Sequence, residues 1–126
     1  MKFLQSLAFK RTTAIGFYLL ILSGSSVPGQ NIPHVFKLTP DKLIHCAEYF
    51  VLSVLMTRWL VSEYDYSRKI LFYVLLIGAF CGMTDELYQD LIPNRTPDFF
   101  DWCLDFVGTV LGITAFVLFR KNREQI

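Results

Sequence analysis

The sequence predicts an all-α fold, a four-helix transmembrane bundle in a single domain. The chain has 126 residues, of which 53% are hydrophobic and 18% are charged, so it is more apolar than an ordinary globular domain. Charged residues are missing from long stretches, such as residues 12–36 and 70–84. No useful length alternates apolar and polar residues as a half-buried strand would. The clustering of charge favours a membrane protein over a compact soluble helical protein.

Composition excludes several other classes of protein. A formal net charge of +1 is too small for a typical nucleic-acid-binding protein. The chain has three cysteines, an odd number, each in an apolar run, which argues against a secreted disulfide scaffold. The many leucine, isoleucine, valine and phenylalanine residues exclude disorder. The expected partner is therefore the lipid bilayer and not a nucleic acid.

Four segments are long enough to cross a bilayer. A spanning helix needs about 17–25 mostly apolar residues, and with interfacial flanks the candidates are residues 12–27, 41–61, 69–90 and 98–119. The first is the weakest, because its second half is rich in serine and glycine. It could instead be a signal peptide, with Lys2, Lys10 and Arg11 before an apolar stretch at 14–22. We favour a span, because no A-x-A cleavage pattern follows and three spans would put the termini on opposite faces.

Basic residues predict the orientation of the bundle. Nine of the 12 lysine and arginine residues fall at the termini or around the connection between the second and third spans. The positive-inside rule then places both termini in the cytoplasm. Eight of the 11 acidic residues fall on the outer half. Acids contribute little to orientation, so this outer excess needs another explanation.

Capping signals mark two helix starts on the outer side. Thr39-Pro40-Asp41 and Thr96-Pro97-Asp98 each predict a threonine cap, proline at the first helical position and an acid in the first turn. The connection at residues 27–40 is too apolar for a plain solvated linker. We therefore expect it to lie across the mouth of the bundle.

Polar side chains line one face of the second helix. The positions 41, 45, 48, 49 and 52 follow helical spacing. The residues there are Asp41, His45, Glu48, Tyr49 and Leu52. Glu48 lies about two turns inside the helix, where a carboxylate facing lipid is costly. It should face the bundle interior, paired or protonated.

The third helix contributes a shorter polar face. Glu86 and Gln89 share a side with Gly82 one turn deeper, whereas Asp85 and Asp90 are expected to lie to the side, nearer the surface.

The fourth helix carries acids above glycines on one stripe. Asp101 and Asp105 are followed by Gly108 and Gly112, a G-x-x-x-G pattern that lets another backbone approach closely. Arg95, in the loop before this helix, is the expected bidentate partner of one or two of the acids.

These residues form one candidate binding site at the outer end of the bundle. Its expected members are Asp41, Lys42, His45, Glu48, Tyr49, Glu86, Gln89, Arg95, Asp101 and Asp105. A catalytic interpretation would draw on His45, Glu86 and Asp101, with a carboxylate as general base. No nucleophile is well placed, so enzymatic activity stays open. A hard cation such as Mg²⁺, Ca²⁺ or Mn²⁺ would suit the oxygen ligands, but one histidine with scattered acids is a weak signal. We assign no metal and no cofactor.

Two motifs in the chain resemble those of the VanZ-like family of small bacterial membrane proteins. The first is Asp41-Lys42-Leu43-Ile44-His45-x3-Tyr49-x2-Leu52. The second is Glu86-Leu87-x-Gln89-x3-Pro93-x-Arg95-x5-Asp101-x6-Gly108-x3-Gly112. Ser25-Ser26-Val27-Pro28 resembles the usual end of the family's first span. Asp105 stands where the family usually has asparagine, four residues after the motif aspartate.

The resemblance implies a multi-pass protein of the bacterial cytoplasmic (inner) membrane. The family's namesake confers resistance to the glycopeptide antibiotic teicoplanin. The outward acidic pocket and this resemblance together make a cell-envelope protein that binds a lipid-linked or glycopeptide-type ligand the leading hypothesis, with an effect on teicoplanin susceptibility as one expectation. A membrane-embedded enzyme acting on an envelope lipid head group and a purely structural or assembly role are the alternatives. The sequence predicts no oligomeric state.

Overall fold

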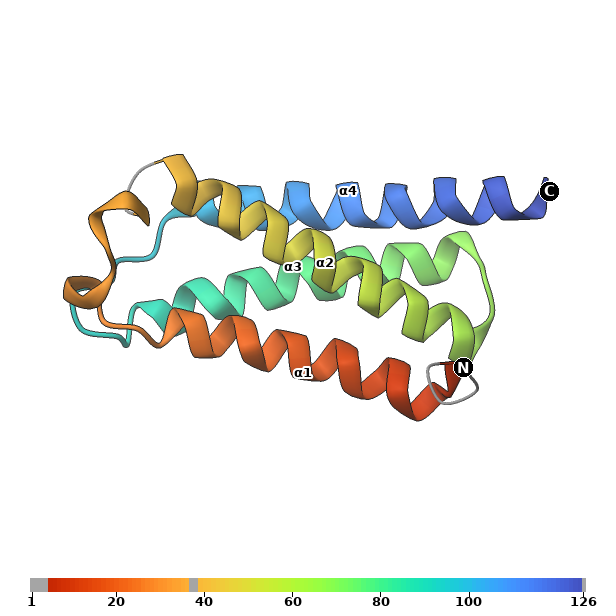
Figure 1. The fold of residues 1–126 in the computed structure, drawn as a ribbon, viewed down its shortest axis with the longest axis horizontal. Helices are drawn as coiled ribbons and strands as arrows, with labels where there is room; N and C mark the ends of the chain where they lie inside the picture. The colour runs from red at the N-terminus through yellow and green to blue at the C-terminus, as the bar shows by residue number, and fades with distance from the viewer. Residues whose placement is uncertain (1–4, 37–38, 126) are drawn as a thin grey trace.

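The computed structural model describes residues 5–36 and 39–125, and these form a helical bundle without a strand. The long helices are α1 (Leu7–Ser25), α2 (Thr39–Tyr64), α3 (Arg68–Gln89) and α4 (Phe99–Glu124). Two short 3-10 helices, η2 (Gly29–Asn31) and η3 (His34–Phe36), lie between α1 and α2. The all-helical prediction is confirmed (Figure 1).

Helix ends follow local capping chemistry, with one correction. Ser6 caps α1 and Ser67 caps α3, each hydroxyl accepting a hydrogen bond of 3.2 Å from a backbone amide three residues on. The prediction that Thr96 caps the fourth helix is wrong. Asp98 is the cap, accepting from the Phe100 amide at 2.8 Å, because an aspartate caps as well as a threonine and stands directly before the helix. The predicted cap at Thr39 lies outside the described side chains.

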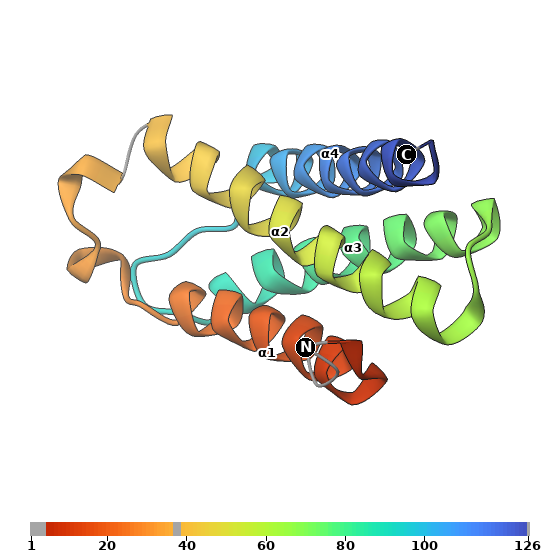
Figure 2. The same cartoon turned by 45° about the vertical axis from the view of Figure 1, so that its right-hand side comes forward.

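The four helices run up and down, so that the two bundle ends differ. α1 begins and α4 ends at the same end as the short turn between α2 and α3 (Figure 1). The opposite end, which we call the loop end, carries the connections after α1 and after α3. In both views α1 lies away from α4, with α2 and α3 between them (Figures 1 and 2). α2 contacts each of the other three helices.

The interior of the bundle is polar and its surface is apolar. Among the described residues, six hydrophobic side chains are buried, against ten polar or charged ones. Leu20, Phe80 and Phe119 are each more than 60% exposed. A soluble protein would reverse this arrangement, whereas hydrocarbon favours apolar side chains outside and polar groups satisfied within. The distribution is that of a membrane protein.

Three helices are long and apolar enough to cross a bilayer. They are Asp41–Tyr64, Arg68–Gln89 and Phe99–Glu124, close to the last three predicted spans. α1 is not among them, which agrees with its weaker pattern. It starts five residues before the predicted segment and ends two residues earlier.

Glycines set the closest helix contact in the bundle. A Cβ at Gly108 would overlap the carbonyl oxygen of Cys46, and one at Gly112 would overlap Phe50 and Ser53. The predicted close approach is confirmed, and α2 is the partner of α4. This contact brings the polar faces of α2 and α4 together at the loop end.

Candidate functional site

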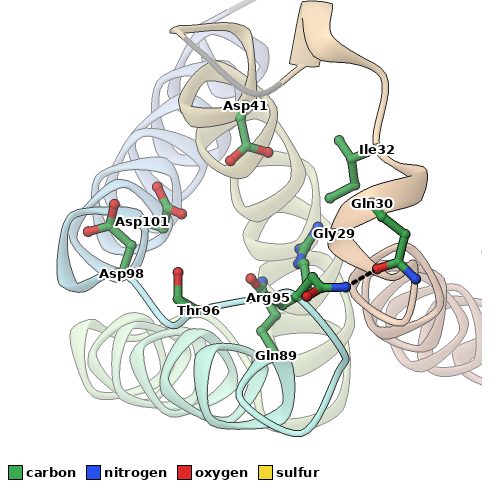
Figure 3. A pocket seen from close by; sticks show the side chains of 10 residues that line it. Gly29, Gln30, Ile32, Asp41, Gln89, Arg95, Thr96, Asp98 and Asp101 are labelled. Atoms are coloured by element: carbon green, nitrogen blue, oxygen red, sulfur yellow. Dashed lines mark hydrogen bonds between the residues drawn. The ribbon is translucent and has the colours of Figure 1, made fainter.

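A polar pocket of about 440 Å³ opens at the loop end (Figure 3). Both connections of the loop end and the helices α2, α3 and α4 contribute to its wall. Figure 3 shows their side chains around a shared space. Nine of the ten lining residues are polar or glycine, and the exception is Ile32. The residues lining it are Gly29, Gln30, Ile32, Asp41, Gln89, Asn94, Arg95, Thr96, Asp98 and Asp101.

The segment after α1 forms one rim of this pocket, as its apolar composition predicted. The Gly29 amide donates to the Pro93 carbonyl at 3.0 Å, and the Asn94 side chain donates to Gln30. Gly29 packs directly on the Asn94 carbonyl, so that a Cβ would overlap it. The two loops of the loop end therefore hold each other in place.

A smaller cavity of about 240 Å³ descends between α1 and α2. It shares Asp41, Arg95 and Ile32 with the larger pocket and reaches Glu48. Glu48 thus lines this open cavity, which agrees with the predicted inward position, and is half-buried. Its carboxylate has no hydrogen bond or ion pair within the described residues.

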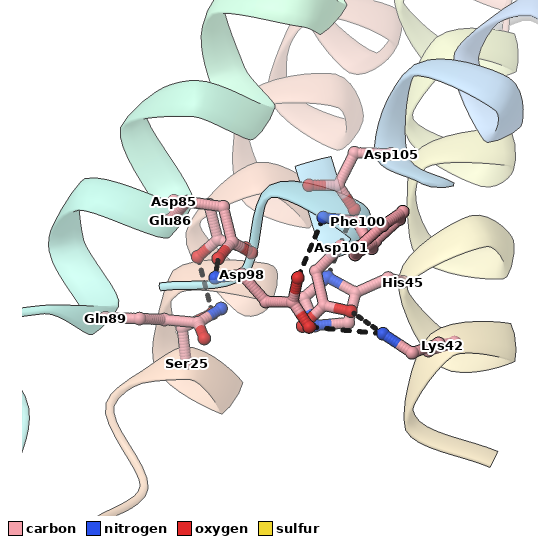
Figure 4. A network of polar contacts seen from close by, with 10 residues as sticks. All are labelled: Ser25, Lys42, His45, Asp85, Glu86, Gln89, Asp98, Phe100, Asp101 and Asp105. Atoms are coloured by element: carbon pink, nitrogen blue, oxygen red, sulfur yellow. Dashed lines mark hydrogen bonds and ion pairs between the residues drawn. The ribbon is translucent and has the colours of Figure 1, made fainter. Parts of the chain in front are cut away.

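Lys42 joins the first turns of α2 and α4. Its Nζ lies 3.2 Å from Asp98 Oδ2 and 3.1 Å from Asp101 Oδ1. The Phe100 amide, and then the Lys42 ammonium, lower the pKa of the Asp98 carboxyl below its usual range. These contacts make Lys42 the cation that compensates the outer acids (Figure 4).

The predicted pairing of Arg95 with an acid is wrong. Within the described residues the Arg95 guanidinium makes no hydrogen bond or ion pair, although it lines both cavities. Lys42 takes that role because α2 starts beside α4, whereas Arg95 sits across the pocket from the acids (Figure 3). The guanidinium is left available to a ligand.

His45 lies below Lys42, between two acids of α4. Its Nδ1 is 3.1 Å from Asp105 Oδ1, and its Nε2 is 3.8 Å from Asp101 Oδ2. The side chain of Asp105 is fully buried and that of His45 is 6% exposed. The predicted grouping of His45 with these acids is confirmed.

Asp85 corrects a further prediction. It was expected near the surface, yet it is fully buried and accepts a hydrogen bond of 2.5 Å from the Ser25 hydroxyl. Gly82, Asp85 and Gln89 recur at spacings of three and four residues, which places them on one helix face. That spacing was the signal that could have located Asp85.

Glu86 and Gln89 also face inward, as predicted. Glu86 Oε2 accepts the Asp98 backbone amide at 2.9 Å, and Gln89 donates to the Ser25 hydroxyl at 3.5 Å. Figure 4 shows these side chains of α3 facing His45 of α2 and the acids of α4. Tyr49 is buried beneath them, and its hydroxyl has no hydrogen-bond partner among the described residues.

The structure thus gathers most of the predicted site and adds members to it. Ser25, Asp85 and Asp98 are polar residues of the site that the sequence did not assign. Among the described side chains, four have buried groups that could serve as metal ligands at one point: His45, Asp85, Glu86 and Asp105.

An apolar groove of about 450 Å³ lies beside the pocket, on the surface of the bundle between α3 and α4. Met83, Leu87, Phe99 and Trp102 supply most of its wall, and Asp98 borders both the groove and the pocket. A polar cavity therefore adjoins a surface that suits hydrocarbon.

Fold and site together define a helical membrane protein with a polar, acid-rich interior open at one bundle end. A protein-family model matches almost the whole of this sequence. The chain belongs to the VanZ/LLP1 family, whose model matches residues 6–120, as the two sequence motifs predicted. Neither the curated proteins nor the solved structures contain a match to the chain.

Proposed function

We propose that the chain is a multi-pass protein of the bacterial cytoplasmic membrane that binds a lipid-linked ligand at the outer leaflet. All four helices span the bilayer in this proposal, and the loop end faces outward. The single observation that carries the ligand is the position of the polar pocket directly beside the apolar groove.

The orientation is supported by the distribution of charge over the bundle. α1 begins and α4 ends at the end of the bundle opposite the loop end. Nine of the 12 basic residues belong to that end by their position in the sequence. The positive-inside rule assigns that end to the cytoplasm. The loop end, with its acids and its pocket, then lies at the outer surface.

The chemistry of the ligand is supported by the unpaired charges around the pocket. Arg95 offers a bidentate donor for a phosphate or carboxylate group. Asp41 has no hydrogen bond or ion pair within the described residues, and it offers an acceptor for amine or hydroxyl donors. The groove beside Asp98 would hold an acyl or prenyl chain. A lipid-linked glycan or peptide has all three features.

Cysteine labelling tests the orientation. With Cys46, Cys81 and Cys103 replaced by alanine, a single cysteine at position 95 should react with an impermeant maleimide added to intact cells. One at position 68 should react only after the membrane is opened. Labelling of position 95 from the cytoplasmic side alone would contradict the proposed topology.

Native mass spectrometry of the purified protein in detergent tests the ligand. The probes are a phosphatidylglycerol, a polyprenyl phosphate and a lipid-linked disaccharide-pentapeptide. Arg95→Gln should weaken retention of a bound probe by about tenfold, the equivalent of about 1.4 kcal/mol for one charge-assisted contact. Arg68→Gln, at the opposite end, is the matched control and should retain the probe. Equal retention by wild type and a Glu86→Ala/Asp101→Ala double variant would also count against the proposal.

A structural role for the same residues is the second candidate. It is favoured by the contacts that join helices, such as Lys42 to Asp101 between α2 and α4. Full complementation of a deletion strain by Glu86→Gln and Asp101→Asn, read as lipid composition and teicoplanin susceptibility, would favour this role over ligand binding.

A further inference from the structure

Four buried side chains from three helices converge below the pocket. His45 comes from α2, Asp85 and Glu86 from α3, and Asp105 from α4 (Figure 4). Each offers one nitrogen or carboxylate oxygen, and these atoms all lie within 4.8 Å of one another. Opposite ligands of a metal ion with bonds of about 2.1 Å lie about 4.2 Å apart, so small adjustments would bring the four onto one ion.

Unpartnered oxygens are the second observation. Each of the three carboxyl groups has one oxygen in contact with a polar group of the protein, as described above, and one buried oxygen without a hydrogen-bond partner among the described residues. The unpartnered atoms are Asp85 Oδ2, Glu86 Oε1 and Asp105 Oδ2. Buried carboxylate oxygens are normally bonded, because leaving one unsatisfied costs about 1–3 kcal/mol or more. Because three side chains that lie close together in space share this pattern, we infer that they share a partner.

Charge indicates what that partner is. Three carboxylates face one imidazole. The Lys42 ammonium is already shared by Asp98 and Asp101, and the Arg95 guanidinium forms no ion pair with any of the three carboxylates within the described residues. Buried charges in proteins are paired or coordinate metals. We propose that His45, Asp85, Glu86 and Asp105 hold a divalent metal ion.

The donor set also selects the kind of ion. Carboxylates alone would suit Mg²⁺ or Ca²⁺, whereas an imidazole among them favours a transition ion. We assign the site to Mn²⁺ or Zn²⁺. The second set of acids around His45, formed by Asp41 and Asp101, is the poorer site, because Lys42 already neutralises Asp101.

The proposed ion would have a structural consequence for the pocket above it. It would tie α2, α3 and α4 together at the depth where their interior is most polar. The metal site does not depend on the proposed lipid-linked ligand, because the side chains that would coordinate the ion all belong to this chain. Failure of lipid binding and failure of metal binding are separate results.

The test uses the full chain, purified in detergent and stripped with a chelator. Titration with MnCl₂ followed by electron paramagnetic resonance should show loss of the free-ion signal at one ion per chain, and ZnCl₂ should compete. Metal should also raise the thermal unfolding temperature of the wild type, because a ligand that binds only the folded state stabilises it. This second readout needs no variant.

Matched variants locate the site. Asp105→Asn and His45→Gln should each weaken Mn²⁺ binding by at least about tenfold, as loss of even a supporting contact does at metal sites. Asp90→Asn, an exposed acid at the end of α3, should bind as wild type does. Absence of stoichiometric Mn²⁺ or Zn²⁺ binding by the wild type would overturn the proposal. So would binding that Asp105→Asn leaves unchanged, and binding of Mg²⁺ or Ca²⁺ alone would overturn the choice of ion.

Discussion

The hydroxyl of Ser25 donates to Asp85 Oδ1 at 2.5 Å, where the last turn of α1 meets α3. Both side chains are buried. α1 is not among the helices that are long and apolar enough to span a bilayer. Its end is held against α3 by this contact and by the bond between the Ser26 and Tyr88 hydroxyls.

Ser25→Ala should therefore destabilise the protein by about 1–3 kcal/mol. The change removes the hydroxyl that donates to Asp85 Oδ1, and Asp85 Oδ2 already lacks a partner among the described residues. Thermal unfolding in detergent, followed by circular dichroism, measures the change. Ser23→Ala, at an exposed position of the same helix, is the control and should change stability by less than about 0.5 kcal/mol. Equal effects of the two changes would show that the Asp85 contact does not stabilise α1.

Gly112→Ala should disrupt the contact between α2 and α4. The added methyl group would overlap Phe50 and Ser53, and overpacking of this kind costs about 1–3 kcal/mol. Gly16→Ala is the matched control, since no atom lies within 4 Å of its added Cβ. That change should leave stability equal or raise it by up to about 1 kcal/mol, through helix propensity. Comparison of the two unfolding temperatures decides the matter, and a Gly112 variant as stable as the Gly16 variant would contradict the close contact.

Lys42→Met should destabilise the start of α4 in a pH-dependent way. Its Nζ contacts both Asp98 and Asp101. Folding lowers the pKa of Asp98, so the stability gained from its charged form is present above the ordinary aspartate pKa of about 3.9. That gain is lost as pH falls through the lower folded pKa. The difference between variant and wild type should be largest at neutral pH and should shrink in acid. Lys69→Met, exposed at the opposite end, should show no such trend.

Glu48→Gln should be tolerated. Glu48 faces a cavity and forms no ion pair with Arg95, although both residues line that cavity. Expression level and unfolding temperature close to those of the wild type are expected. Severe loss of folding would instead reveal a charged pair between Glu48 and Arg95. Glu48→Leu, which removes polarity but keeps size, would separate a need for polarity at this position from a need for charge.

Helical periodicity predicted the inward polar face of α2 correctly, and the same rule applied to α3 would have found Asp85. The partner of the acids could not be found in this way. Arg95 is close to Asp98 and Asp101 in the chain, whereas Lys42 is more than fifty residues away and reaches them because α2 and α4 start side by side. Proximity in sequence favoured the wrong cation. The unpartnered oxygens are likewise a property of three helices packed together, and no local pattern records them.

At Gly108 and Gly112 the backbone of α4 lies so close to α2 that even an added Cβ would overlap it. We therefore expect these two helices to move together. α1 and α3 are joined to that pair through smaller interfaces. Any widening of the mouth must come from displacement of α1 or α3, together with the loop that each helix carries, while the side walls formed by α2 and α4 keep their spacing. Access to the interior is then governed by two loops that are bonded to each other through Gly29 and Pro93, so they would open as a pair.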